Sequence, residues 1–115
     1  MTTEREVDAR AFLTARRRGR ALTFGELLRA IRVGEEETQA AFASRLRIPK
    51  QHLSDIENGR RGVSVERAAA WAKTLGYHAG QFVELAVQAQ LQAAGLPFVV
   101  TVVGRRRAPG RSRAA

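Results

Sequence analysis

The stretch TQAAFASRLRIPKQHLSDIENGRR, residues 38–61, holds two short amphipathic segments separated by only a few residues. The first follows Thr38, a residue that can cap a helix, and repeats its apolar residues at helical spacing. The second follows Pro49, which fits a helix start, and ends at Asn58 and Gly59, where glycine accepts a left-handed backbone. The stretch therefore predicts two short helices joined by a tight turn.

The second of these helices has one apolar and one polar side. Leu53 and Ile56 share the apolar side, which predicts that this side packs on a core. The polar side carries Lys50, Gln51, Ser54, Asp55 and Asn58. A helix about 10–12 Å across fits a major groove about 12 Å wide, so these side chains could contact base edges. The alternative is a solvated helix face with no partner.

Four polar residues are the candidate base readers: Lys50, Gln51, Ser54 and Asp55. Gln51 can pair with adenine, and Lys50 can reach guanine or a phosphate. Asp55 can accept a hydrogen bond from cytosine, or from a nearby lysine, glutamine or arginine of this chain. The candidate contacts to the DNA backbone are Gln39, His52, Asn58, Arg60 and Arg61.

Helical periodicity extends beyond this stretch, from residue 22 to residue 94. A first helix is expected after Thr23, with Glu26 completing a capping box. A fourth helix is expected from the Ser64 cap to Gly76, and a fifth from about residue 80 to residue 94. The fifth has a second apolar face that includes Val83, Val87 and Leu91. That face could pack on residues 1–20, on the C-terminal segment or on another subunit.

Residues 96–103, LPFVVTVV, have the β-branched and aromatic composition of a strand. No second strand is evident, so a symmetric strand pair in a dimer is one interpretation, and an extended tail along the helices is the other. Phe98 and Val100 are therefore candidate dimer or partner contacts, together with the second face of the fifth helix.

The net charge of +9 lies mainly at the two ends of the chain. Residues 1–20 form a basic extension with six arginines and three acids, and their pattern allows a helix of about three turns. Residues 104–115 have the composition of a disordered basic tail, whereas residues 21–95 are nearly neutral. Basic ends favour a polyanionic partner such as double-stranded DNA, although an arginine-rich composition also arises in GC-rich genomes.

Residues 23–76 resemble the Xre/Cro-type helix-turn-helix domain of lambdoid phage repressors and bacterial regulators. The resemblance rests on TQAAFASRL, IPKQHLSDIENGRR and SVERAAAWAKTLG. It implies an all-α, five-helix lambda-repressor-like domain, to which the composition of the chain adds residues 96–103 as a short C-terminal β-strand and basic tails at both ends. It also implies that Gln39 contacts the DNA backbone, that Lys50, Gln51 and Asp55 read bases, and that Arg32 and Glu57 form a structural ion pair.

The family usually has glycine in the turn where this chain has Arg47. A left-handed residue other than glycine costs on the order of 1 kcal/mol. Glu35, Glu36 and Glu37 precede the second helix, and we expect them to point away from DNA because they would repel phosphate.

The function that these observations favour is a dimeric DNA-binding regulator acting as a repressor, in the bacterial cytoplasm and associated with the nucleoid. An antitoxin that binds a toxin protein and represses its own operon is the alternative. With no cysteine, two histidines and no glycine-rich phosphate loop, we expect neither an enzyme nor a metal or cofactor site. No apolar run is long enough for a membrane span, so no membrane partner is expected.

Overall fold

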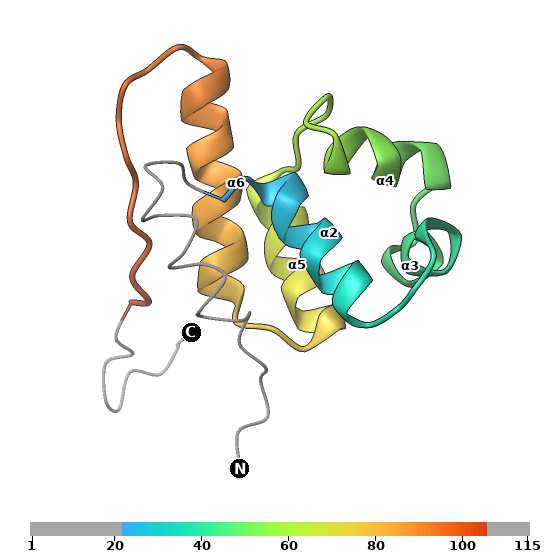
Figure 1. Cartoon of the computed structure of the whole chain (residues 1–115). Coiled ribbons are helices and arrows are strands. Elements are labelled where there is room, and N and C mark those ends of the chain that lie inside the picture. The colour runs from blue at the N-terminus through green and yellow to red at the C-terminus, as the bar shows by residue number, and fades with distance from the viewer. Residues whose placement is uncertain (1–21, 106–115) are drawn as a thin grey trace, which may run out of the picture.

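The computed structural model describes residues 22–105, and they form five α-helices without a β-strand (Figure 1). The helices are α2 (Phe24–Gly34), α3 (Gln39–Leu46), α4 (Lys50–Glu57), α5 (Val65–Leu75) and α6 (Ala79–Ala93). The all-α, five-helix expectation is confirmed. The expected N-terminal extension, residues 1–20, and most of the expected basic tail lie outside the described residues.

The helix boundaries follow from side chains that cap free backbone groups. The Thr23 hydroxyl accepts from the Glu26 amide at 3.1 Å, and the Glu26 carboxylate accepts from the Thr23 amide at 3.0 Å. Thr38 and Ser64 each accept from an amide in the first turn of α3 and α5. Each cap satisfies an amide that has no partner within its helix, and such a cap contributes about 1 kcal/mol.

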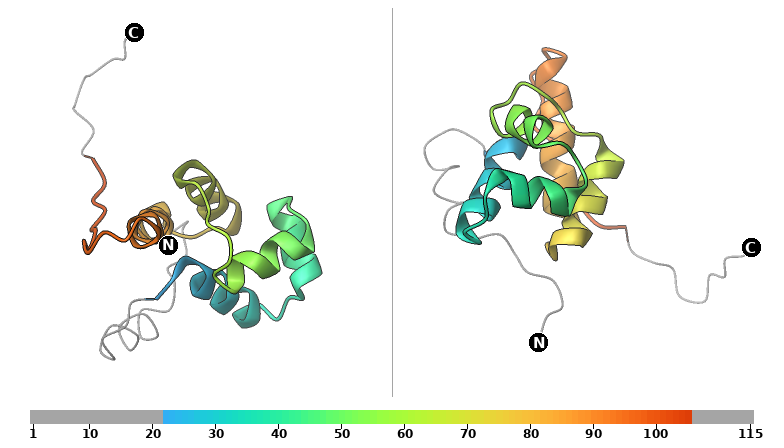
Figure 2. Two further views of the ribbon diagram at one scale, coloured as in Figure 1. Left: turned by 90° about the horizontal axis from the view of Figure 1, so that it is seen from above. Right: turned by 90° about the vertical axis from the view of Figure 1, so that its right-hand side faces the viewer.

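A single hydrophobic core joins the helices. Phe24 from α2 and Phe82 from α6 meet edge to face, with ring centroids 5.7 Å apart. Phe82 and Leu53 have no exposed surface, so α6 and α4 are both fixed to this core. In Figure 1, α3 and α4 lie at one end of the molecule and α6 at the other, and the view from above in Figure 2 agrees.

Gly25 lets α2 approach α4 more closely than any other residue would. A Cβ atom at position 25 would lie 2.1 Å from the carbonyl oxygen of Ile56, in the backbone of α4. The backbones are therefore in contact at this point, without side chains between them. This contact fixes the position of α4 relative to the rest of the domain.

The expected strand at residues 96–103 is wrong for the described chain, because these residues are extended but pair with no strand. We call residues 96–103 the strap. The strap follows a turn after α6 and runs back along that helix (Figure 1). Among residues 22–105 no second strand is present, so the strap bonds to side chains of α6 and not to a β-partner.

The second apolar face of α6 is half-buried at Val83, Val87 and Leu91. Of the two strap residues expected to contact a partner, Val100 is half-buried and Phe98 is 60% exposed. Within one chain, the strap therefore agrees with the second interpretation of residues 96–103, an extended tail that packs along the helices.

Candidate nucleic-acid interface

The turn between α3 and α4 is built from three residues with distinct roles. Arg47 ends α3 in the left-handed conformation, with φ 61° and ψ 43°. The buried side chain of Ile48 anchors the turn in the core, and Pro49 starts α4 in an extended conformation. Arg47 occupies the position that glycine usually takes. Its left-handed backbone therefore carries a strain of about 1–2 kcal/mol.

α4 presents one face to the outside of the molecule. Leu53 and Ile56 are buried, whereas Lys50 and Gln51 are exposed and Ser54 and Asp55 are half-exposed. The structure therefore brings the four candidate base readers together on a single accessible face. The candidate partner contacts on α6 and the strap lie at the other end of the molecule (Figures 1 and 2).

Asp55 holds two neighbouring side chains. Its Oδ1 atom accepts from Gln51 Nε2 at 3.1 Å and from Arg60 Nη2 at 3.0 Å. These hydrogen bonds, first that of Gln51 and then that of Arg60, lower the pKa of Asp55, so the carboxylate stays charged at neutral pH. Asp55 was expected to accept a hydrogen bond either from cytosine or from a side chain of this chain. The structure contains hydrogen bonds of the second kind, from Gln51 and Arg60.

Glu57 is the buried charge beneath this face, with a side chain only 3% exposed. Its two carboxylate oxygens accept from Arg32 Nε at 2.8 Å and Arg32 Nη2 at 3.1 Å. Gln39 Nε2 donates to the same carboxylate at 3.0 Å. Paired donors of this kind compensate a carboxylate for loss of water. The cluster thereby ties α2, the start of α3 and the end of α4 together.

The end of α4 and the following loop carry the remaining polar candidates. Asn58 Nδ2 donates to the carbonyl oxygen of Ser54 at 2.8 Å, so this side chain folds back on its own helix. Arg60 and Arg61 are exposed. His52 is half-buried; burial, followed by the charges of Arg61 and Arg67, lowers its pKa, which favours the neutral ring.

Arg67 is a residue that the sequence reasoning missed. It lies in the first turn of α5, near enough to His52 to affect its pKa, and its guanidinium lies over the Trp71 ring at 5.6 Å from the centroid. With Arg61 it extends the positive charge beside α4. An arginine three residues after the Ser64 cap was the available signal, because a helix start that follows a candidate recognition helix can face the same duplex.

Two of the three acids before α3, Glu35 and Glu37, share one arginine as their ion-pair partner. Arg45 Nη1 donates to Glu35 Oε1 at 2.8 Å and also forms an ion pair with Glu37. The Tyr77 hydroxyl donates to Glu35 at 3.3 Å. Pairing with Arg45 reduces the repulsion that these acids would exert on a phosphate backbone.

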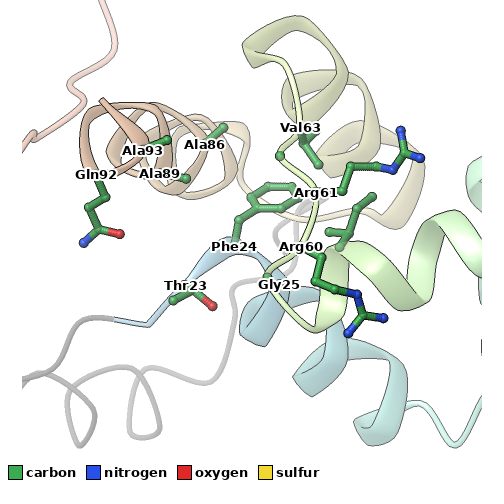
Figure 3. Close-up of a pocket in the computed structure, with 13 residues that line it drawn as sticks. Thr23, Phe24, Gly25, Arg60, Arg61, Val63, Ala86, Ala89, Gln92 and Ala93 are labelled. Carbon is green, nitrogen blue, oxygen red and sulfur yellow. The ribbon is translucent and has the colours of Figure 1, made fainter. Parts of the chain in front are cut away.

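A hollow of about 470 Å³ lies between the start of α2, the loop after α4 and α6 (Figure 3). Its apolar walls include Phe24, Ala89 and Ala93, and no acidic or histidine side chain lines it. The side chains of Arg60 and Arg61 extend from the loop to the side away from α6. The hollow is thus separate from the exposed face of α4.

Within residues 22–105, no group of three histidine, aspartate or glutamate side chains could hold a metal ion. None of the helices in that range is long and apolar enough to cross a membrane.

Comparison with known proteins gives one result. A helix-turn-helix family model matches residues 28–82, which include α3, the turn and α4. No curated protein and no solved structure matches the chain. The matched region agrees with the resemblance to Xre/Cro-type domains, and residues 28–82 are therefore similar to the helix-turn-helix domains of that family.

Proposed function

We propose that the protein is a sequence-specific, double-stranded DNA-binding transcriptional regulator that acts as a dimeric repressor. The observation that supports this most strongly is the accessible polar face of α4, held in place by a buried apolar side and by the Glu57 cluster. In this proposal α4 enters the major groove and its polar side chains contact the bases.

Gln51 and Lys50 are the main base readers in this proposal. Gln51 retains its amide oxygen and one amide hydrogen after donating to Asp55, and these are the groups that pair with adenine. Lys50 extends from the first turn of α4, where a long cationic side chain can reach guanine or phosphate. Ser54 adds a hydroxyl that can donate or accept. Asp55 positions Gln51 and Arg60 through Oδ1, and its Oδ2 atom can still accept from a cytosine amine.

Contacts to the DNA backbone supply most of the affinity. Gln39 lies at the first turn of α3, where free amides and the positive end of the helix favour a phosphate. Arg60, Arg61 and Arg67 are exposed cations beside α4, and His52 lies among them. Each phosphate neutralised by one of these arginines would make binding weaker at higher salt.

Selection of bound duplexes from a random pool tests the proposal. The wild-type protein should enrich one palindromic sequence with half-sites separated by about one helical turn or a multiple of it. The double variant Lys50→Ala, Gln51→Ala should lose this preference and keep weak, salt-sensitive binding, because its backbone contacts remain. Enrichment of the same sequence by the double variant would show that α4 is not the reader.

A matched control is available in the same chain. Lys73 on α5 and Gln90 on α6 are both exposed, so Lys73→Ala, Gln90→Ala removes the same two side-chain types from other helices. This control should enrich the wild-type sequence. It separates loss of the α4 contacts from loss of one positive charge.

An antitoxin is the second candidate, and the exposed apolar residues of the strap support it as a surface for a toxin. A toxin that co-purifies at a fixed ratio, with release on deletion of the strap, would establish this function.

A further inference from the structure

The strap is attached to α6 through one edge of its backbone. Gln88 Nε2 donates to the carbonyl oxygen of Phe98 at 2.8 Å, and Gln88 Oε1 accepts from the Val100 amide at 2.8 Å. One turn earlier, Glu84 Oε1 accepts from the Val102 amide at 2.9 Å. The four residues from Glu84 to Gln88 advance about 6 Å along α6, close to the roughly 6.8 Å between alternate residues of an extended chain. The strap is therefore extended and antiparallel to α6.

On the opposite edge of the strap, three amides have no hydrogen-bond partner among residues 22–105. Backbone groups of successive residues in an extended chain point to opposite edges, so those of Val99, Thr101 and Val103 point away from Glu84 and Gln88. Within residues 22–105, none of these three amides donates a hydrogen bond. With respect to the described residues, the strap thus has one bonded edge and one open edge.

The strap also carries most of the exposed large apolar side chains of the described chain. The exposed large hydrophobic residues are Val33, Leu96, Phe98, Val99 and Val103, and all except Val33 belong to the strap. Val99 and Val103 are 84% and 80% exposed. An uncharged, unpaired backbone edge flanked by exposed apolar side chains is a template for pairing with another chain.

We propose that a second copy of this chain occupies the open edge, with the two straps antiparallel and the two-fold axis at Thr101. The three open amides are evenly spaced around Thr101, so Val99 of one copy lies opposite Val103 of the other. Each Thr101 then donates to the other copy. The strap pairing would form the dimer that the proposed function requires. The inference rests on the proposed function only for the biological purpose of that dimer.

Charge favours this arrangement over its alternatives. Arg105, Arg106 and Arg107 follow the strap in the sequence, and a parallel pair would bring the arginines of both copies together. In the antiparallel pair, Arg105 lies about eight residues from Arg105 of the second copy, roughly 27 Å away and beyond the Debye length of about 8 Å. The strap itself has no charged residue, so it offers no ion pair to an acidic partner of another sequence.

A substitution at the axis tests the pairing. Thr101→Pro removes the outward amide and leaves the bonds from Val100 and Val102 to α6 in place. It deletes two hydrogen bonds per dimer, so the dimer dissociation constant in sedimentation equilibrium should rise about 30-fold. Thr101→Ala is the matched control, because it keeps the amide and should remain dimeric. Circular dichroism should show unchanged helix content in both variants.

The absence of cysteine allows a direct test of register. Facing residues in a hydrogen-bonded antiparallel pair have Cα atoms about 5.5 Å apart, within disulfide range. Thr101→Cys should therefore form a disulfide-linked dimer under mild oxidation. Val103→Cys should not, because two copies of residue 103 lie roughly 14 Å apart in this register.

Three results would overturn the inference: a monomeric wild-type protein, a Thr101→Pro variant as dimeric as Thr101→Ala, or faster cross-linking through position 103 than through position 101. If the wild-type protein is a monomer, the open edge of the strap would instead be a binding surface for a protein of another sequence. A monomer that still selects a DNA sequence would refute the strap pairing alone. A strap-paired dimer that selects no DNA sequence would refute the proposed function alone.

Discussion

Replacing Gly25 by alanine places a methyl group against the backbone of α4. The new Cβ would lie 2.1 Å from the Ile56 carbonyl oxygen, more than 1 Å closer than ordinary contact. The neighbour is backbone, which cannot rotate aside as a side chain can. The two helices must separate, and overpacking of this kind costs about 1–3 kcal/mol.

Alanine also favours a helix by about 0.5–1 kcal/mol relative to glycine, which offsets part of this cost. Because the contact is with backbone, we take the upper end of the overpacking cost, about 3 kcal/mol, and after this offset expect Gly25→Ala to lower the free energy of unfolding by about 2 kcal/mol, measured by urea denaturation. Since 1 kcal/mol corresponds to about 4–8 °C for a domain of this size, the Tm should fall by roughly 8–16 °C.

Gly34 in the same helix is the matched control. A Cβ atom at position 34 would have nothing within 4 Å in the described structure, so Gly34→Ala should be neutral or slightly stabilising. Equal unfolding free energies for the two variants would refute the close approach of α2 and α4. Gly25→Ala should also weaken DNA binding, since it displaces the end of α4 that carries Ile56.

Three further predictions concern single side chains. Glu57→Ala leaves Arg32 without its carboxylate and should destabilise the fold by about 3 kcal/mol in urea denaturation, and a loss below about 1 kcal/mol would contradict the structural role of the pair. Arg47→Gly relieves the left-handed conformation and should stabilise by about 1 kcal/mol, whereas destabilisation would refute the strain. His52 has a lowered pKa in the folded state, so its contribution to stability is complete above the unfolded value of about 6.5 and falls as the pH drops below it. An NMR titration midpoint below 6.5 should move upward when DNA phosphate binds, and a midpoint above 6.5 in the free protein would refute the influence of burial and of Arg61.

The sequence by itself determined the helices and the face of α4. Cap residues such as Thr23 and Ser64 act within a few positions, and apolar spacing reports which side of a helix is buried, so both are local signals. The accessible position of Lys50 and Gln51 follows from that same spacing. Local periodicity therefore carried the prediction of a five-helix domain with an exposed polar helix.

Tertiary structure alone decided the remaining features, because they depend on contacts between residues distant in sequence. The close backbone contact at Gly25 exists only because α4 passes over α2, and the position of Arg67 near His52 depends on how α5 follows the loop. The strap has the composition of a strand, but a strand needs a partner edge, and within the described chain the available groups are the side chains of Glu84 and Gln88. Composition reports the preference of a segment, whereas the hydrogen-bond partners within reach decide its structure.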